Sequence, residues 1–426
     1  MWRISNLLWF KPKKMEKILK DQGLKGNPYR FMNGDLNEIV QMMSEANSKP
    51  MNLSHDIVPR VEPFLHKSIT TLGKSYFTWM GTKPMVHVSD PSMIREVLAN
   101  YKKYEKFLGD NPLARLIGTG LIDAKGDQWD KRRKIINPAF HMEKLKASKS
   151  VYIPGIRFLP TKNNKRMKEI HQQVRGLIKG IINKRVVAMK AGEASHDDLL
   201  GILLHSNFKE IEEHGNKSFG LSMDDVIEEC KIFYVAGQET TGNLLVWTMI
   251  LLGQHTEWQT RAREEVLHVF GDKKPDINGL SHLKVMSIIF NEVLRLYPPA
   301  GYLRRLINDE TKLGNLTLPA GTLIEISSLF LHHDKDTWGE DVNEFKPERF
   351  SKSVSKVANG QALYLPFGGG PRICIGQNFT TLEAKMAFAM ILQCFSFELS
   401  PSYSHAPIQM PVLSPQFGAH FILHKL

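Results

Sequence analysis

The sequence predicts a mainly α fold with a smaller β-rich region. Apolar residues follow helical spacing through most of residues 196–300, whereas strand patterns are short and confined to residues 76–89, 309–328 and the C-terminal tail. Helices and strands do not alternate as a parallel sheet with crossover helices requires. With 42% hydrophobic and 23% charged residues, the 426-residue chain has the composition of a globular protein with a large core, which excludes a disordered or collagen-like chain.

The N-terminal region has an apolar stretch that is too short to cross a membrane. Ile4–Phe10 is followed by Lys-Pro-Lys-Lys, whereas a spanning helix needs roughly 20 apolar residues. Two interpretations remain open: the cytoplasmic flank of a truncated signal anchor, or an amphipathic helix that lies on the protein. We interpret residues 1–25 as the remnant of an anchor with its linker, and residues 26–426 as a single domain.

Turn and capping signals place the other elements. The longest helix is expected from Ser222 to about Gly253, because Ser222 and Asp225 are spaced nearly as in a capping box, which satisfies free amides of the first turn. A Pro319-Ala320-Gly321 turn separates two strands of the β-rich region. The further elements, in chain order, are strands at Tyr76–Met80 and Met85–Ser89, a helix from Asp90-Pro91, a basic helical region at 126–147, strands at Leu316–Leu318 and Thr322–Ser327, a helix at Gln377–Cys394 and a β-like tail.

One short stretch carries most of the chemical information. Phe367-Gly-Gly-Gly-Pro-Arg-Ile-Cys374-Ile-Gly376 sets a cysteine among glycines directly before a helix. Small residues let the backbone approach a large flat group, and amides near a helix N-terminus favour the thiolate of a nearby cysteine. A lone cysteine is usually a small buried hydrophobe, but chance rarely places five such residues over ten positions. The pattern therefore indicates a thiolate ligand to haem iron.

The other cysteines and the net charge narrow the alternatives. Cys230 and Cys394 lack such a setting and are predicted to be packing residues. Three scattered cysteines suit neither a disulfide framework nor a four-cysteine zinc site, which favours a reducing compartment. Lys and Arg number 56 against 44 Asp and Glu, and the net charge of +12 favours acidic partners or an anionic membrane surface. No basic and aromatic interleaving points to nucleic acid.

The chain resembles cytochromes P450, and among them the plant members of the 72 clan, the secologanin-synthase-like group. Three segments carry the likeness: Leu-Thr-Leu-Pro-Ala-Gly at 316–321, Phe-Lys-Pro-Glu-Arg-Phe at 345–350 and Pro-Arg-Ile-Cys-Ile-Gly-Gln-Asn-Phe at 371–379. The resemblance implies the cytochrome P450 fold, a haem b cofactor with Cys374 as axial ligand of the iron, and a monooxygenase. Such an enzyme inserts one oxygen atom from O2 into a lipophilic small molecule, here a terpenoid, with electrons from NADPH through NADPH-cytochrome P450 reductase.

The resemblance also implies which residues bind the haem. Guanidinium groups suit the propionates through charge-assisted, bidentate bonds. Arg304 could serve as well as its neighbour Arg305. The positions that match cofactor-binding residues of the family are Phe367, Arg372, Trp129, Arg133 and Arg305.

Residues 236–241, Ala-Gly-Gln-Glu-Thr-Thr, lie inside the longest predicted helix. A glycine at such a position costs about 1 kcal/mol relative to alanine, so something must compensate for it. Either the helix opens locally and Glu239 and Thr240 pass protons towards dioxygen, or the helix packs closely at Gly237. The cysteine loop favours the first interpretation, and an intact acid and threonine pair disfavours a P450 isomerase or dehydratase that needs no O2.

Glu292 and Arg295 are three residues apart and share one helix face. In most proteins this would be a surface pair of little energetic value. The resemblance instead implies a buried pair tied to Arg349, in which the three residues support the haem loop and do not catalyse.

Two polar clusters allow other readings. His332 and His333 could be metal ligands, but adjacent residues on a strand point to opposite faces, so we expect no competing metal site. The basic run 131–134 is either a solvated helix face or a dock for the acidic flavin domain of a reductase, and both can hold at once.

The resemblance further implies a substrate pocket and a location. An apolar pocket selects a bulky lipophilic substrate. We expect a monomer at the cytosolic face of the endoplasmic reticulum membrane, or a peripheral or soluble protein if the anchor is truncated. The stretches that match pocket-lining positions are 104–117, 232–240, 300–303 and 410–414.

One departure from the family concerns length. Only 107 residues (236 minus 129) separate Trp129 from Ala236, where relatives place several more helices. We infer that a block corresponding to the D, E and much of the F helices is absent, with the join near Leu145 to Ser150. Its loss should expose apolar surface. A catalytically inert, truncated haem-binding or misfolded splice product is therefore the alternative to an active enzyme.

Overall fold

The computed structural model describes residues 2–107, 121–122, 124–136, 162–193, 198–216, 220–352 and 364–426. The chain forms two compact units. One comprises Met1–Glu105, Thr240–Cys374 and Thr380–Leu426, and the other comprises Lys106–Glu239 and Ile375–Phe379. The predicted mainly α fold with a smaller β-rich region is confirmed.

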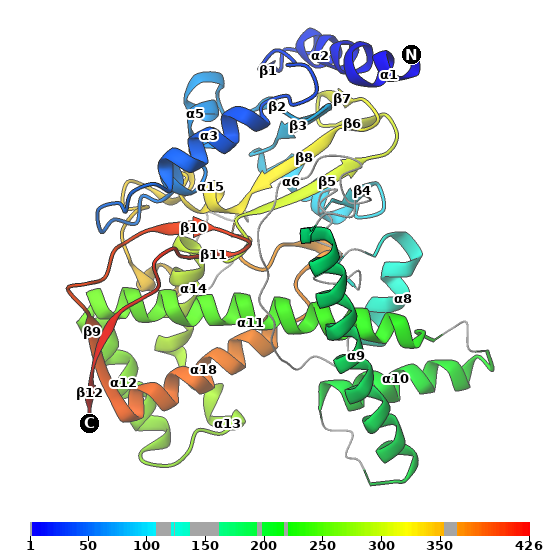
Figure 1. Ribbon diagram of the computed structural model, residues 1–426. Helices are drawn as coiled ribbons and strands as arrows, with labels where there is room; N and C mark the ends of the chain where they lie inside the picture. The colour runs from blue at the N-terminus through cyan, green and yellow to red at the C-terminus, as the bar shows by residue number, and fades with distance from the viewer. Residues whose placement is uncertain are drawn as a thin grey trace. The chain divides into compact units, whose positions relative to one another are not determined.

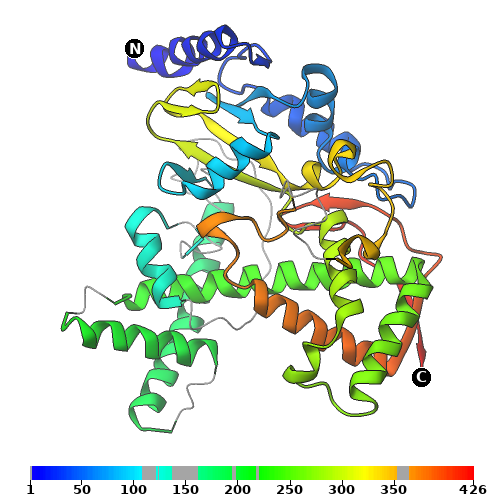
Figure 2. The same ribbon diagram turned by 180° about the vertical axis from the view of Figure 1, so that it is seen from behind.

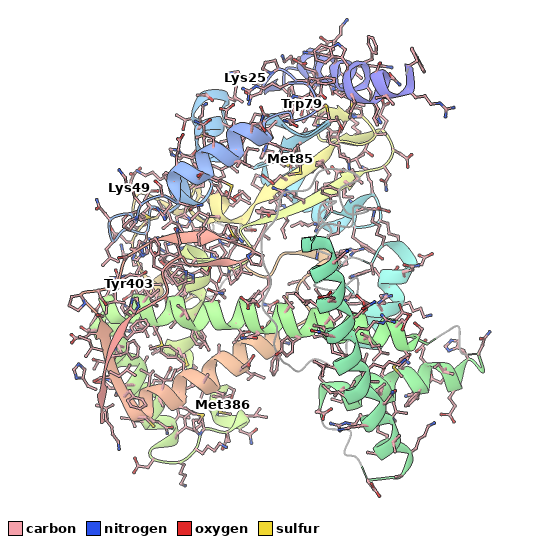
Figure 3. The ribbon with its side chains drawn as sticks, viewed as in Figure 1. Lys25, Lys49, Trp79, Met85, Met386 and Tyr403 are labelled. Atoms are coloured by element: carbon pink, nitrogen blue, oxygen red, sulfur yellow. The ribbon has the colours of Figure 1, made fainter. Side chains whose placement is uncertain are left out.

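A six-stranded mixed sheet forms most of the β-rich region (Figure 1). The central strands pair antiparallel (β2 with β3, β5 with β8) and parallel (β3 with β8), with Met85 opposite Leu323. Trp79 and Met85 are buried within this region (Figure 3). In sheet order the strands are β1 (Lys25–Gly26), β2 (Tyr76–Met80), β3 (Lys83–His87), β8 (Leu323–Ser327), β5 (Tyr302–Ile307) and β4 (Tyr104–Lys106).

Three two-stranded sheets complete the β structure of the described residues. They are β6 (Thr311–Leu313) with β7 (Leu316–Leu318), β10 (Pro407–Gln409) with β11 (Leu413–Pro415), and β9 (Phe395–Leu399) with β12 (Phe421–Lys425).

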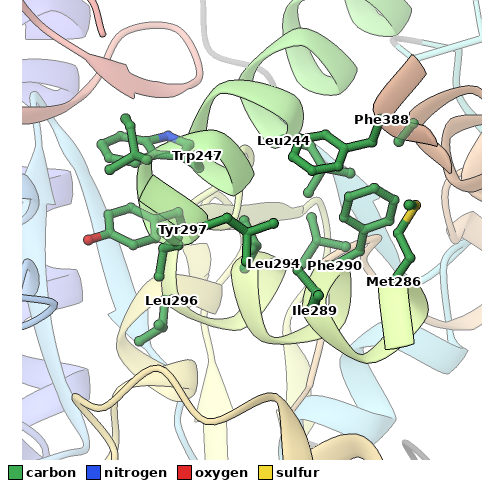
Figure 4. Packing of buried hydrophobic residues seen from close by; sticks show 14 of the residues in the cluster. Leu244, Trp247, Met286, Ile289, Phe290, Leu294, Leu296, Tyr297 and Phe388 are labelled. Atoms are coloured by element: carbon green, nitrogen blue, oxygen red, sulfur yellow. The ribbon is translucent and has the colours of Figure 1, made fainter. Parts of the chain in front are cut away.

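The helices of the first unit bury a large apolar core (Figure 4). Trp247 of the longest helix stacks on Tyr297 with ring centroids 4.1 Å apart, and Phe290 meets Phe388 edge to face. Not every helix contributes to this core. Apart from the N-terminal helices and α11, the helices of the first unit are α3 (Leu36–Ala46), α4 (Val58–Val61), α5 (Pro63–Leu72), α6 (Pro91–Ala99), α12 (Thr256–Phe270), α13 (Ile277–Leu280), α14 (Lys284–Leu296), α15 (Ser328–His332), α16 (Lys335–Trp338) and α18 (Gln377–Cys394).

The second unit is helical in its described part. It contains α8 (Gly126–Ile136), α9 (Lys162–Lys190) and α10 (Leu199–Glu213), and the longest helix, α11 (Met223–Gln254), runs through both units (Figure 2). The predicted capping box is confirmed at the start of α11: the Asp225 amide donates to Ser222 Oγ at 3.1 Å, and the Ser222 amide donates to Asp225 Oδ2 at 3.0 Å.

The N-terminal segment is helical from its first described residue. α1 (Trp2–Ser5), a π-helical turn (Asn6–Phe10) and α2 (Lys11–Asp21) follow one another directly. Within α2, Met15 and Leu19 are buried in an apolar cluster shared with the sheet, as expected for an amphipathic helix that lies on the protein. In the part of the chain that the structure describes, none of the helices combines the length and the apolarity that a membrane span requires.

Two elements differ from the sequence-based expectation. Helix α9 was not predicted, because residues 162–190 contain Gly176 and Gly180. These two glycines lower the helix propensity of this strongly basic segment. His332 and His333 do not lie on a strand: His332 ends α15 and His333 follows it, because Ser327 caps a short helix there by accepting the Phe330 amide. The opposite-face argument about these two histidines was therefore wrong.

Burial is the main cause that lowers the pKa of four histidines in the first unit. The pKa falls to about 3 for His55 and His332 and to about 4 for His333 and His405. In the unfolded chain they would bind protons near pH 6.5, so between pH 6.5 and 4 the unfolded state binds more protons than the folded state. Stability should therefore fall as the pH is lowered through this range, by up to roughly 1.4 kcal/mol per pH unit for each histidine.

Urea unfolding at a series of pH values between 7 and 5 measures this dependence. His55→Phe should reduce the slope of the unfolding free energy against pH, whereas His66→Gln, which alters an exposed imidazole, should leave the slope unchanged. An unfolding free energy that stays constant from pH 6.5 to 5 would contradict the prediction.

Candidate active site

The cysteine loop is a closed turn that leads into helix α18. The Gly368 amide donates to Leu365 O at 3.1 Å, and the Cys374 amide donates to Phe367 O at 2.9 Å. These bonds bring Phe367 and Cys374 to the two ends of one turn, and the Cys374 side chain is exposed. The helix begins at Gln377, three residues beyond the cysteine.

One glycine of the loop is required by its surroundings. Gly370 has a φ of +66°, and a Cβ added there would lie 2.2 Å from Leu98 O at the end of α6. A side chain would clash with this backbone and strain the left-handed conformation. The loop therefore packs against α6 through backbone contact, which only glycine permits.

Glu292 and Arg295 on α14 form a fully buried, bidentate ion pair. Arg295 Nη2 lies 2.7 Å from Glu292 Oε1, and Arg295 Nε lies 2.8 Å from Glu292 Oε2. The remaining guanidinium donors reach backbone carbonyls of His332 (2.9 Å) and Val342 (2.8 Å). The bonds to His332 and Val342 therefore join α14 to two segments that precede the cysteine loop in the chain.

Arg349 joins the same cluster from the short 3-10 helix Pro347–Phe350. Its Nε lies 3.4 Å from Glu292 Oε1, and its Nη1 lies 2.8 Å from Asp341 Oδ1. Hydrogen bonds from Lys346, followed by those from Arg349, lower the pKa of Asp341 to about 2. The structure thus brings Glu292, Arg295 and Arg349 together, whereas their role as supports of the haem loop stays a prediction.

Arg304 and Arg305 are neighbours on β5 but have different partners. Arg304 Nε lies 2.6 Å from Glu325 Oε2 on β8, and its guanidinium lies over the Tyr302 ring at 4.2 Å. Arg305 is buried, and no described residue accepts a hydrogen bond from its Nε. Because adjacent side chains of a strand point to opposite faces of the sheet, Glu325 neutralises the charge of Arg304 but does not reach Arg305. The Arg305 charge has no carboxylate partner among the described residues.

The environment of Arg305 fits an anionic group. Burial, and then the positive charge of Arg372, lower the pKa of Arg305 to about 10. A buried cation beside a second cation is stabilised by an anion, and the propionates of haem are carboxylates. Together with the exposed Cys374 thiol, which can ligate iron, Arg305 and Arg372 form a donor set that fits haem b.

Glu239 and Thr240 lie within an uninterrupted helix. The backbone of α11 is α-helical from Met223 to Gln254, so the local opening expected near Gly237 is not present. Close packing does not explain this glycine either, because, beyond its chain neighbours and the backbone of its own helix, no described atom lies within 4 Å of the position that a Gly237 Cβ would take. The part of Glu239 and Thr240 in proton delivery stays a prediction.

Helix α8 carries Trp129 and Arg133 in the second unit. Trp129 is buried, and the Arg133 guanidinium lies 5.9 Å from the centre of its ring. Arg132 forms ion pairs with Asp225 and Glu229 of α11 and is mostly buried, so it does not belong to a solvated docking face. That part of the interpretation of the basic run was wrong, because the carboxylates that neutralise Arg132 come from a distant part of the sequence.

The two other cysteines differ from each other. Burial raises the pKa of Cys230 to about 12, in keeping with a packing residue. Cys394, the last residue of α18, is exposed, so its interpretation as a packing residue was wrong.

Of the stretches expected to line a pocket, 108–117 lies outside the described residues. In the first unit the Leu413 amide donates to Pro299 O at 3.0 Å, and Trp247 Nε1 donates to Leu413 O at 3.0 Å. These bonds attach the segment 410–414 to both α11 and the segment that follows α14.

A mainly α fold with a buried glutamate and arginine pair and a glycine-bounded cysteine loop fits haem-thiolate proteins, in which a cysteine ligates the haem iron. The chain belongs to the cytochrome P450 family: a family model described as Cytochrome P450 matches residues 58–152 and 149–422. Members of this family bind haem b, and the chain is a cytochrome P450 monooxygenase. Membership implies a small-molecule substrate, O2 and a redox partner.

Several plant proteins are similar over the whole chain. Cytochrome P450 CYP72A219 of Panax ginseng is 50% identical, and the alignment covers 100% of this chain and 96% of that protein. Secologanin synthase 1 and 7-deoxyloganic acid hydroxylase, both of Catharanthus roseus, are each 45% identical, with 100% of this chain and 95% and 96% of those proteins covered. The predicted resemblance to the secologanin-synthase-like group is confirmed.

Proposed function

We propose that this monooxygenase inserts one oxygen atom of O2 into a lipophilic terpenoid, with two electrons from NADPH delivered by NADPH-cytochrome P450 reductase. The overall reaction consumes substrate, O2, two electrons and two protons and yields hydroxylated substrate and water. The similarity to secologanin synthase and 7-deoxyloganic acid hydroxylase supports the terpenoid class. The observation that carries the proposal is the cysteine loop held against α6 and followed by α18.

In this proposal each residue has a defined task. Haem, when bound, supplies the iron at which dioxygen is activated, with a thiolate as electron donor. Cys374 would ligate the haem iron, and Arg372, Arg305, Trp129 and Arg133 would bind the propionates. The carboxylate of Glu239 and the hydroxyl of Thr240 pass protons towards the oxygen. Phe367 shapes the turn, and the Glu292 cluster supports it.

The carbon monoxide difference spectrum of the reduced protein tests the proposal. A Soret band at the thiolate position is expected after reconstitution with haem. Failure of the full chain to take up haem would contradict the proposal and favour an inert product.

Replacing Arg305 with methionine should have opposite effects on the haem-free and haem-loaded protein. Without haem, Arg305→Met removes a buried cation that has no carboxylate, so stability should rise by about 1 kcal/mol. With haem, it removes charge-assisted bonds to a propionate, so haem affinity should fall at least about tenfold. Thermal unfolding and haem titration measure the two effects.

Arg304→Met is the matched control for this experiment. It should destabilise the haem-free protein, because Glu325 would lose its 2.6 Å partner in the sheet. Equal haem affinities of the two variants would show that Arg305 has no special part in cofactor binding.

We further propose that the chain lacks an internal block of helices near residues 145–150, a stretch outside the described residues. The family model matches the chain in two segments, 58–152 and 149–422, which overlap at residues 149–152. The match is therefore interrupted at this point of the chain. The alignment with the Panax ginseng protein extends over 497 residues, 71 more than this chain contains (497 minus 426). On α9, Leu177, Ile181 and Val187 are 70%, 60% and 67% exposed, which is the kind of apolar surface that a missing neighbour leaves.

A missing block of helices would favour the alternative to an active enzyme, a catalytically inert, truncated splice product. Sequencing the transcript across the codon of Lys146 tests it. An uninterrupted message without a longer form would show that the short chain is the natural one. If a longer form exists, its haem uptake should exceed that of this chain.

We also propose that the protein works at the surface of the endoplasmic reticulum membrane. The net charge of +12 and the exposed Trp2, Leu7 and Phe10 beside a basic α2 support this location. Co-sedimentation with anionic vesicles measures it. Trp2→Ser combined with Leu7→Ser should reduce the bound fraction, and unchanged binding would contradict the part given to this segment.

A further inference from the structure

A fully buried histidine connects the start of the cysteine loop with the Glu292 and Arg295 ion pair. His332 ends α15, and its Nε2 lies 2.8 Å from the backbone nitrogen of Leu365. The amide is the donor, so the ring nitrogen accepts. The His332 carbonyl in turn accepts from Arg295 Nη1 at 2.9 Å. One residue thus contacts both the ion pair and the loop.

The bonds continue from Leu365 to the cysteine. Leu365 O accepts the Gly368 amide at 3.1 Å, and Phe367 O accepts the Cys374 amide at 2.9 Å. Next to Leu365, the Tyr364 hydroxyl donates to Asn291 O on α14 at 2.9 Å, and its ring lies 5.3 Å from the His332 ring. The first residues of the loop are therefore held by α14 and α15 together.

The tautomer of His332 shows what the imidazole adds to this position. Since Nε2 accepts a hydrogen bond, the ring proton of the neutral form lies on Nδ1, which forms no well-aligned hydrogen bond with a described residue, although backbone groups of Leu294 and Arg295 lie near the ring. A buried donor without an acceptor costs free energy. An apolar ring of similar size would pack without that cost, so packing alone does not account for a histidine. What an apolar ring could not provide is the hydrogen-bond acceptor at Nε2, to which the Leu365 amide donates.

We propose that His332 is a positioning residue of the haem-thiolate site: it accepts the Leu365 amide and thereby fixes the start of the turn that carries Cys374. The proposal rests on the proposed role of Cys374 as haem ligand. It predicts that loss of the acceptor loosens the loop while the rest of the fold is kept, because the variant also removes the unpaired donor at Nδ1.

Three variants of the full chain separate this role from packing. His332→Phe keeps a ring and removes the acceptor, whereas His332→Gln restores an acceptor oxygen. His333→Phe is the matched control, because His333 is also buried and adjacent, but its Nδ1 donates to Leu329 O, at 2.9 Å within its own helical turn.

Hydrogen exchange on the haem-free protein provides the first readout and does not depend on the haem role of Cys374. His332→Phe should speed exchange of the Leu365 and Gly368 amides roughly tenfold, with a melting temperature close to that of His333→Phe. His332→Gln should exchange close to the wild-type rate. Equal exchange of these amides in His332→Phe and His333→Phe would overturn the proposal.

The carbon monoxide difference spectrum of the haem-loaded protein provides the second readout. His332→Phe should convert part of the thiolate Soret band to the band of a neutral axial ligand, and His332→Gln should restore it. A thiolate band that is unchanged in His332→Phe would overturn the positioning role. Absence of the band from the wild-type protein would instead contradict the role of Cys374 and leave the exchange result to decide on His332.

Discussion

Cys374→Ser is expected to abolish the thiolate Soret band of the reduced, carbon monoxide-treated protein, together with all monooxygenase activity. The reason is chemical: a serine hydroxyl remains protonated and does not replace a thiolate as an electron-donating ligand. The turn that holds the residue should persist, because its bond runs from the backbone amide of residue 374 to Phe367 O. The melting temperature of the haem-free variant should therefore stay near that of the wild type.

The other two cysteines supply the controls for this experiment. Cys394→Ser changes an exposed side chain at the end of α18 and should preserve the band. Cys230→Ser should preserve it as well, because burial keeps the Cys230 thiol protonated by raising its pKa to about 12. If Cys374→Ser retained the band, or if either control removed it, the assignment of the axial ligand would be wrong.

Glu292→Gln is expected to destabilise the folded protein by about 3–5 kcal/mol, because it leaves the Arg295 guanidinium buried without its counter-charge. The substitution also weakens the contact with Arg349 and the bond that Glu292 accepts from the Lys346 amide at 3.0 Å. The free energy of unfolding in urea measures the effect. Haem uptake should fall with it, since the same cluster leads through His332 to the cysteine loop.

An exposed ion pair and a double variant sharpen this prediction. Glu340→Gln breaks the pair of Glu340 with Lys335, at 3.0 Å on the surface, and should change the free energy of unfolding by less than about 1 kcal/mol. Adding Arg295→Met to Glu292→Gln should recover part of the loss, because it removes the unpaired cation. A Glu292→Gln variant as stable as Glu340→Gln would contradict a supporting role for the pair.

Local sequence signals predicted the elements that depend on neighbouring residues. Ser222 and Asp225 cap α11, which begins at Met223, one residue after the predicted start. Helix α18 spans Gln377–Cys394, as predicted. Strand β3 begins two residues earlier than predicted, at Lys83, since its register is set by pairing with β2 and β8. Helix α9 escaped prediction because Gly176 and Gly180 lower its intrinsic helix propensity, although its many Lys and Arg residues favour a helix.

The sequence by itself determined the fold class, the cysteine loop and the family, because each depends on short segments whose residue types and spacing are informative alone. Only the tertiary structure distinguished Arg305 from Arg304, placed His332 against Leu365 and removed Arg132 from the docking face. In each case the deciding partner is distant in the chain. A side chain's charge compensation and hydrogen bonding depend on which segments fold against it, and a linear pattern does not contain that information.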